Sequence, residues 1–411
     1  MLIKGNLISP KVSIQHIAAV INHEEDNELK IAPVLSRHHV EPGQYQKMRV
    51  STAAQLLSHS TASVLRFCVQ NGTLENDALT TAWFVDFINK WFDVVNAPHY
   101  QFAMTPFSTD SVQVLHEMVD LASKVMFSGK RCSWKPIQTG LLLSTHCIIG
   151  LYTDLVGSGL YRYLLPGRLT QDPLENFFSQ VRSTGFSHPS PAHFRQWLKL
   201  ISVSQFMQMP CHSSYATDDF TYIVNFLRKD VGGTVGDDQL DEDQFVRFID
   251  VDESELSLSM SEGNALFYTA GWIAFKLRQQ LRGCSMCVSA IIGDISPQVD
   301  NRYAQLTMIK TYGNLIVPSA ALFQLICNAE QNFRSRKAML NLSRNVLKFL
   351  IGNIDSLLVA SDLPACHCLG HKALVKFYNL RAAIWAKHLT SQTTTVIQHG
   401  SKTAKACTSI Q

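Results

Sequence analysis

This sequence of 411 residues is poor in charge and in long apolar runs, and each shortage excludes a class of protein. Charged residues make up 17% of the chain and the formal net charge is +3, so a DNA contact would need a local basic patch. No segment approaches the ~20 consecutive apolar residues of a membrane helix, and Met1–Asn6 does not begin a signal peptide. The sequence therefore predicts an intracellular protein without a membrane segment.

Two ligand-binding motifs are also missing. No G-x-x-x-x-G-K-[ST] loop is present, since Gly400-Ser-Lys-Thr403 lacks the preceding glycine spacing, and this excludes a P-loop nucleoside triphosphatase. The acidic stretch in residues 209–263 lacks the spacing and central glycine of an EF-hand, so its composition predicts a solvated, partly disordered linker. A hydrophobic content of 46% can still form a sizeable core, and the length predicts two or three domains.

Helical periodicity dominates the rest of the chain. Ser51 or Thr52 can cap a helix that ends at Asn71-Gly72, and a wide apolar face predicts a second helix over residues 78–96. Asn89 and Asp93 share one face of this second helix, where they can also form an ordinary solvated polar stripe.

An acidic helix start lies at Asp172-Pro-Leu-Glu175. Asp172 can cap the helix, Pro173 suits its first position because no N–H is needed there, and Glu175 lies at the third position. The apolar residues that follow recur at helical spacing, which places Glu175 at the rim of a buried face. The pattern alone leaves open whether these two acids only cap the helix or also take part in chemistry.

The run from Tyr163 to Ser183, continuing through His188 to Arg195, resembles the closing RNase H-like segment of the P-element-type DNA transposases, which have THAP-domain relatives. The resemblance implies that Glu175 is the last carboxylate of an Asp-Asp-Glu site for Mg²⁺, and Asp172 matches the other acid of the motif. In the family such carboxylates support two-metal cleavage and strand transfer of DNA.

The two catalytic aspartates of the family would lie upstream of this sequence. We therefore expect a transposase fragment or derivative that is catalytically incomplete and does not cleave or join DNA by itself. The alternative is a domesticated, non-enzymatic protein that binds nucleotide or DNA.

Lys47–Ser60 and Phe84–Asn96 resemble the GTP-binding domain that interrupts the RNase H-like fold in this family. The resemblance implies that Asp93 and Asn96 recognise the guanine edge, and that Arg49 and Val50 lie next to the nucleotide. A carboxylate that accepts from the guanine N–H groups is suitable chemistry for choosing guanine over adenine. Val34 occupies a position where the family leads us to expect a lysine, which weakens the predicted attraction for phosphate.

Ten cysteines without a secretory signal indicate reduced thiols rather than a disulfide framework. Cys284-Ser-Met-Cys287 and Cys368-Leu-Gly-His371 have the spacing of a tetrahedral zinc site, in which thiolate and imidazole are suitable ligands. Such a site would link two distant parts of a C-terminal helical domain. The alternative is that these are buried or incidental thiols.

Together these observations predict a mostly α protein with some α/β structure: an incomplete RNase H-like core, interrupted by a helical GTP-binding insertion domain and followed by a C-terminal helical domain. The predicted ranges are 1–28 (end of the first RNase H-like segment), 29–157 (GTP-binding insertion), 158–208 (RNase H-like C-terminal segment), 209–263 (acidic linker), 264–390 (C-terminal helical domain) and 391–411 (disordered tail). The resemblance further implies transposon-end DNA and guanine nucleotide as partners, a homo-oligomer, and a nuclear location.

Overall fold

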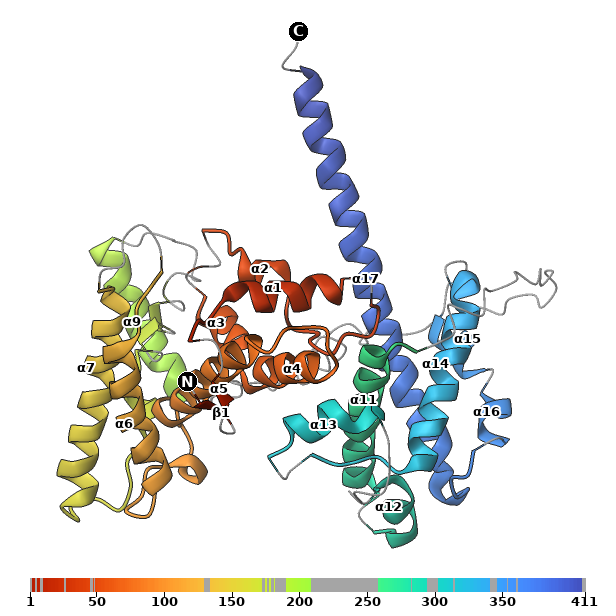
Figure 1. Ribbon diagram of the computed structural model, residues 1–411, viewed down its shortest axis with the longest axis horizontal. Helices are drawn as coiled ribbons and strands as arrows, with labels where there is room; N and C mark the ends of the chain where they lie inside the picture. The colour runs from red at the N-terminus through yellow and green to blue at the C-terminus, as the bar shows by residue number, and fades with distance from the viewer. Residues whose placement is uncertain are drawn as a thin grey trace. The chain divides into compact units, whose positions relative to one another are not determined.

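The computed structural model describes residues 2–3, 6–7, 10–25, 27–44, 47, 49–128, 134–171, 174–175, 177–178, 181, 190–207, 258–281, 283–293, 302–312, 315–340, 346–352, 354–359 and 361–408 (Figure 1). Its contacts divide the chain into two compact units, one formed by Met1–Ala82 with Thr217–Gln411 and the other by Trp83–Ala216. Helices predominate in both units, which confirms the predicted mostly α class.

The first unit begins with a short antiparallel hairpin of β1 (Leu2–Ile3) and β2 (Asn6–Leu7), in which Leu2 pairs with Leu7. The helices that follow are α1 (Ile14–His23), α2 (Arg37–Val40), α3 (Val50–Leu56), α4 (His59–Gln70) and the first turn of α5 (Ala78–Val95). The helix expected from Ser51 to Asn71 is thus two helices. Ser58 causes the break, because its hydroxyl accepts from the amide of Thr61 at 3.2 Å and caps α4.

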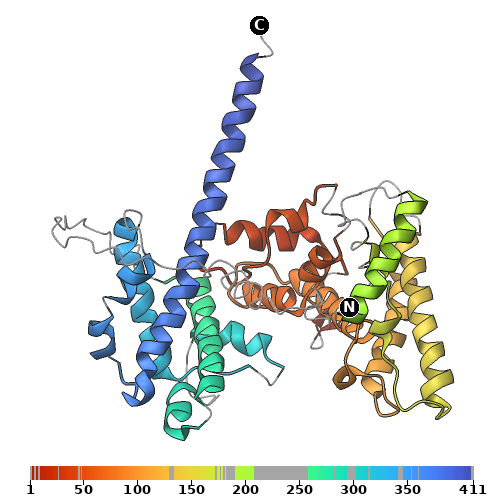
Figure 2. The same ribbon diagram turned by 180° about the vertical axis from the view of Figure 1, so that it is seen from behind.

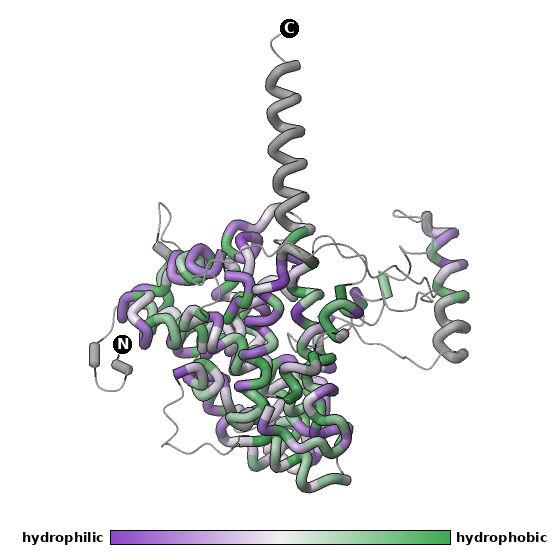
Figure 3. The backbone as a smooth tube through the Cα atoms, turned by 90° about the vertical axis from the view of Figure 1, so that its right-hand side faces the viewer, coloured by the Kyte–Doolittle hydropathy of each residue, from purple (hydrophilic) through white to green (hydrophobic). Residues whose placement is uncertain are grey.

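The C-terminal part of the first unit is a helical bundle. Its elements are α11 (Met260–Gln280), α12 (Ser285–Ile291), η6 (Arg302–Ala304), α13 (Gln305–Lys310), α14 (Ala320–Leu340), α15 (Val346–Ile351), α16 (Asp355–Val359), η7 (Cys366–Cys368) and α17 (Leu369–Thr408). Helices α11, α14 and α17 lie side by side (Figures 1 and 2). Hydrophilic and hydrophobic residues alternate along most of the helices, as expected of amphipathic helices with one buried face (Figure 3).

Helix α11 begins at a capping box that the sequence shows as Ser259-Met-Ser-Glu262. The Ser259 hydroxyl accepts from the Glu262 amide at 3.2 Å, and the Glu262 carboxylate accepts from the Ser259 amide at 3.3 Å. One turn further, Asn264 is fully buried and its side-chain oxygen accepts from the amide of Leu306, which fixes α13 against α11. A single buried amide therefore joins two helices that are separated by more than twenty residues of chain.

Helix α17 extends to Thr408, well into the range 391–411 that was predicted as a disordered tail. No proline follows Pro364, so no residue removes a backbone donor from the helix. Gly400 weakens helix propensity but does not end the helix.

A buried network of charged side chains joins the N-terminal and C-terminal parts of the first unit. Arg381 of α17 is 1% exposed and its Nε donates to Glu330 of α14 at 2.8 Å. Glu330 also accepts from Arg334 at 2.9 Å, and Arg334 pairs with Glu262 at 2.7 Å. The carboxylate of Glu28 accepts from Arg381, 353 residues further along the chain, and pairs with Lys337.

Glu28 is held in place by a loop that is organised around the buried carboxylate of Glu24. Glu24 follows α1 and accepts from the amide of Ile31 at 2.6 Å and from the Asn27 side chain at 3.2 Å. Burial raises the pKa of Glu24, although both hydrogen bonds oppose the shift. For Glu28, burial alone would raise the pKa, but hydrogen bonds from Lys337 and Arg381, and the charges of these two residues, lower it to about 2.

The second unit packs the C-terminal part of α5 against α6 (Thr109–Lys124) and α7 (Pro136–Leu151), and also contains η2 (Tyr100–Phe102), the π-helical η3 (Tyr152–Gly157), η4 (Pro166–Leu169) and α9 (Pro191–Met207). Its buried cluster centres on Phe87, Met118 and Ala122. The buried Gln138 donates to the carbonyl of Val125 at 2.9 Å, and Trp91 donates to Thr145 at 3.1 Å.

Within the described residues, one helix, Pro136–Gly157, is long and apolar enough to cross a membrane on length and composition. One such helix is weak evidence of a membrane span, and here Gln138 and Thr145 lie among its buried side chains and bond to α5 and to the end of α6.

Candidate metal centre and nucleotide-site residues

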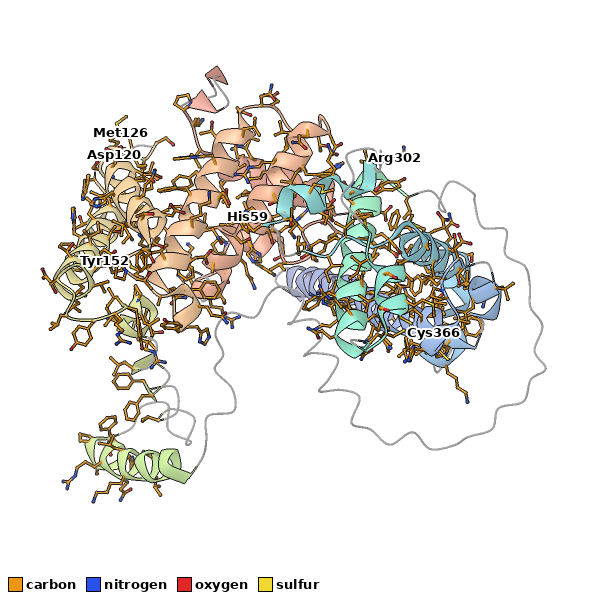
Figure 4. The ribbon with its side chains drawn as sticks, turned by 90° about the horizontal axis from the view of Figure 1, so that it is seen from below. His59, Asp120, Met126, Tyr152, Arg302 and Cys366 are labelled. Carbon is orange, nitrogen blue, oxygen red and sulfur yellow. The ribbon has the colours of Figure 1, made fainter. Side chains whose placement is uncertain are left out.

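Four side chains that are far apart in the sequence gather at one end of the C-terminal bundle: Cys284, Cys287, Cys366 and His367. Their ligand atoms all lie within 4.8 Å of one another. The sulfurs of Cys284 and Cys366 are 3.8 Å apart, and the Cys287 sulfur lies 3.5 Å from Nδ1 of His367. Cys366, labelled in Figure 4, is 2.9 Å from the same Nδ1.

Local backbone structure produces this cluster from two short segments. Cys284 is the N-cap of α12 and Cys287 lies in its first turn, so the Cys-x-x-Cys spacing places both sulfurs on one side of the helix start. On the other segment, His367 and Cys368 both have positive φ, 55° and 51°. This left-handed turn is costly for residues other than glycine, and it lies directly before α17, which begins at Leu369.

The cluster is partly shielded from solvent. Cys287 is fully buried, Cys284 and Cys366 are half-buried, and His367 is exposed. A hydrogen bond from the backbone amide of Cys287 lowers the pKa of the Cys284 thiol, whereas burial raises the pKa of Cys287 to about 12. The pKa of Cys284 is therefore lower, and the pKa of Cys287 higher, than that of an ordinary thiol.

The structure brings the predicted first ligand pair, Cys284 and Cys287, together with Cys366 and His367 rather than with Cys368 and His371. Cys368 and His371 are both exposed and are not members of the cluster. The segment Cys366-His-Cys-Leu-Gly-His371 offers several Cys and His pairs, and spacing alone cannot choose among them. The choice depends on the left-handed turn at His367, for which the sequence carries no glycine signal.

The residues predicted to read guanine lie at the end of α5 and just beyond it. Asp93 is exposed, and its carboxylate accepts from Asn89, one turn earlier, at 2.8 Å. Asn96 is half-buried and follows the last residue of the helix. Gly167 of η4 packs against its backbone so closely that a Cβ would lie 2.6 Å from the Asn96 carbonyl oxygen. A glycine is therefore required where this turn passes the end of α5.

The other two residues predicted near the nucleotide lie at the start of α3. Arg49 is the N-cap and Val50 the first residue of the helix, and both are exposed. A hollow of about 180 Å³ lies elsewhere in the first unit, beside α1 and α2, and none of the four predicted nucleotide residues lines it. Its charged lining is already partly paired, since Arg37 bonds to Glu25 at 2.5 Å.

Glu175, the predicted metal-binding carboxylate, is exposed, and its amide donates to the carbonyl of Gln171 at 2.9 Å. Asp172 lies outside the described residues.

Two family descriptions match the chain. Residues 5–103 match the TNP-like, GTP-binding insertion domain, a range that contains Arg49, Val50, Asp93 and Asn96. Residues 255–373 match the C-terminal domain of the DNA transposase THAP9, a range that contains the four residues of the Cys/His cluster. The chain is also 29% identical over 207 residues to the transposable element P transposase of Drosophila melanogaster. The chain is a relative of the P-element-type transposases.

The similarity to the Drosophila relative covers 48% of this chain and 27% of the relative's length. Among solved structures, the Drosophila P element transposase strand transfer complex is similar over 48% of this chain and 47% of that chain, with 26% identity and a TM-score of 0.44. Most of the first matched range and all of the second lie within the first compact unit. Two segments that match as separate domains of P-element-type transposases therefore fold here as parts of one unit.

Proposed function

We propose that this chain is part of a P-element-type DNA transposase and that it binds guanine nucleotide through Asp93 and Asn96. The match of residues 5–103 to a GTP-binding insertion domain carries this proposal, because it includes both residues. Asp93 has a solvent-exposed carboxylate, which can accept from the N1–H and N2–H groups of guanine. Asn96, one helical turn later, adds an amide that can donate to the guanine carbonyl.

The family resemblance separately implies that Arg49 and Val50 of the first unit lie next to the nucleotide. Arg49 supplies a permanent positive charge for phosphate, and Val50 supplies an exposed apolar surface. The half-buried Val34 offers no charge where the family resemblance leads us to expect a lysine. We therefore expect weaker phosphate binding than a lysine would provide.

Calorimetric titration with GTP, GDP and ATP tests the proposal. Asp93→Ala should weaken GTP binding about tenfold or more, because a hydrogen bond to a charged group contributes roughly 1.5 to 3 kcal/mol. ATP binding should change much less, since adenine lacks the donors that Asp93 would bind. Asp120→Ala, at an exposed aspartate of α6, is the matched control and should leave both affinities unchanged. Equal affinities for all three nucleotides, or none for any, would contradict guanine recognition.

We also propose that Glu175 binds Mg²⁺ in the DNA reaction of the assembled transposase. Its exposed carboxylate and its place in a segment that resembles the family's last catalytic acid support this role. A DNA substrate would also require a nuclear location. Because the chain is expected not to cleave DNA by itself, the test uses a complete transposase that contains this segment. There, Glu175→Gln should reduce excision of a marked transposon in cells to background while leaving GTP affinity unchanged, and Glu117→Gln on α6 should reduce neither. Unchanged excision by Glu175→Gln would contradict this role of Glu175, whereas no excision even by the unaltered protein would favour the alternative of a non-enzymatic, nucleotide-binding protein.

A further inference from the structure

We propose that Cys284, Cys287, Cys366 and His367 bind one zinc ion. The four side chains offer three sulfurs and one imidazole nitrogen, a ligand set that zinc prefers in structural sites. This proposal is independent of nucleotide binding, since it concerns a different part of the chain.

The distances in the cluster agree with a tetrahedral zinc site. With Zn–S bonds of ~2.3 Å and a Zn–N bond of ~2.0–2.1 Å, a tetrahedron requires S···S separations of about 3.8 Å and S···N separations of about 3.5 Å. The Cys284–Cys366 sulfurs are 3.8 Å apart, and the Cys287 sulfur is 3.5 Å from His367 Nδ1. The separation between the Cys366 sulfur and His367 Nδ1, 2.9 Å, would need to lengthen by about 0.6 Å to reach the tetrahedral value.

The alternative bonding patterns fit less well. A disulfide requires sulfurs about 2.05 Å apart, well below the 3.8 Å between Cys284 and Cys366. Ligation by Cys368 and His371 would require both exposed side chains to replace two residues that are already next to Cys287. The geometry therefore selects the adjacent pair, Cys366 and His367.

The unfavourable backbone at His367 supports the same ligand set. A residue with a Cβ rarely adopts φ near 55°, and a second such residue directly after it is rarer still. The left-handed turn brings Nδ1 of His367 next to the sulfurs of Cys287 and Cys366. Strain at consecutive residues is expected where the surrounding structure, here a ligand cluster, requires that conformation.

The proposed site has a structural role. Four protein ligands fill a tetrahedral shell and leave no position for water or substrate, as in structural zinc sites. The ion would join the start of α12 to the turn before α17, across 80 residues of sequence between Cys287 and His367. Zinc would thereby fix where α17 enters the bundle.

Metal analysis of the full chain, purified without chelator, tests the proposal. We expect about one zinc ion per chain. Replacement by Co²⁺ should give the visible absorption bands of a tetrahedral site and a sulfur-to-metal charge-transfer band scaled to three thiolates. Alkylation of the native protein, read by mass spectrometry, should label the exposed Cys368 and spare Cys284, Cys287 and Cys366 until zinc is removed.

Matched variants distinguish the two ligand sets. Cys284→Ser and Cys366→Ser should lower the zinc content to near zero, whereas Cys368→Ser and His371→Ala should retain about one zinc. Because a ligand variant can also unfold, the alkylation pattern of the unaltered protein provides a second, independent readout. A folded chain without zinc, a Cys284–Cys366 disulfide in the native protein, or loss of zinc in Cys368→Ser would each overturn the proposal.

Discussion

Two polar clusters hold α17 in the first unit, and they differ in one respect. In the charged network, Arg381 lies between the carboxylates of Glu28 and Glu330, so each buried charge has a partner of opposite sign. In the Cys/His cluster, all four groups are electron-pair donors, and their ligand atoms lie next to one another. The charges of the first cluster are paired by the chain's own residues, although Nη1 of Arg381 has no hydrogen-bond partner among the described residues, whereas the second cluster is the one for which we propose a cation.

The comparison shows that the chemical types of the buried side chains determine whether a cluster can be neutralised within the chain or needs a bound ion. Carboxylates and guanidinium groups neutralise one another, so their burial depends on pairing within the chain. Three thiolates repel one another, and a shared metal ion would offset that repulsion while it binds the imidazole as a fourth ligand. The two clusters should therefore respond differently to substitution, pH and chelator.

The largest effect is expected at Arg381. Arg381→Met keeps the length of the side chain but leaves Glu330, fully buried, with one cationic partner fewer. Breaking a buried ion pair from one side typically costs about 3 to 5 kcal/mol, so the thermal unfolding midpoint of the first unit should fall sharply. The double variant Arg381→Met with Glu330→Gln should recover part of the loss. A single variant as stable as the unaltered protein would mean that the network does not hold α17.

A smaller, pH-dependent effect is expected at Glu28. Its pKa is lowered from 4.5 to about 2, so its ionised form stabilises the fold at pH values above 4.5. This contribution, on the order of 2 kcal/mol once solvent screening is allowed for, should disappear as the pH falls from 4.5 towards 2. Unfolding midpoints measured across this range should converge for the unaltered protein and Glu28→Gln. Glu25→Gln, at an exposed carboxylate nearby, is the control, and a constant difference for Glu28→Gln at all pH values would contradict the assignment.

The smallest effect concerns the left-handed turn of the Cys/His cluster. Cys368→Gly should relieve the unfavourable φ of 51° and stabilise the protein by about 1 kcal/mol, with zinc retained. Cys368→Ala keeps the Cβ and serves as the control, which should show no gain. Loss of the metal in Cys368→Gly would indicate that Cys368 is a ligand, as the spacing of Cys284, Cys287, Cys368 and His371 predicts. The proposed ligand set of Cys284, Cys287, Cys366 and His367 would then be wrong.

Local features of this fold were predictable from the sequence, whereas long-range pairings were not. The helix expected over residues 78–96 is observed as Ala78–Val95, because its apolar period and Pro98 determine it locally. The break before α4 was missed, although Ser58-His-Ser-Thr61 carries a capping signal. The start of α11 at Met260 was likewise signalled by Ser259 and Glu262 but was expected only from Asn264.

The candidate sites show the same limit. Cys284 and Cys287 could be chosen because their spacing is local, but their partners depend on a backbone turn about 80 residues away. The role of Arg381 could not be predicted, because its partners Glu28 and Glu330 are distant in the sequence. Without them, nothing in the local pattern distinguishes a buried arginine from an exposed one. The guanine-reading roles of Asp93 and Asn96 rest on family resemblance and stay a prediction.

The bond between Glu28 and Arg381 also has a consequence during synthesis. The two residues are separated by 353 positions, so at ~5–20 residues per second the ribosome makes Arg381 roughly 20 to 70 s after Glu28. Throughout that interval Glu28 lacks the guanidinium of Arg381. His59 of α4 likewise lacks Lys310 and Tyr312, the later residues that contact it. The first unit can therefore complete this ion pair only after Arg381 has emerged from the ribosome, and until then its early segments wait for a partner that is made much later.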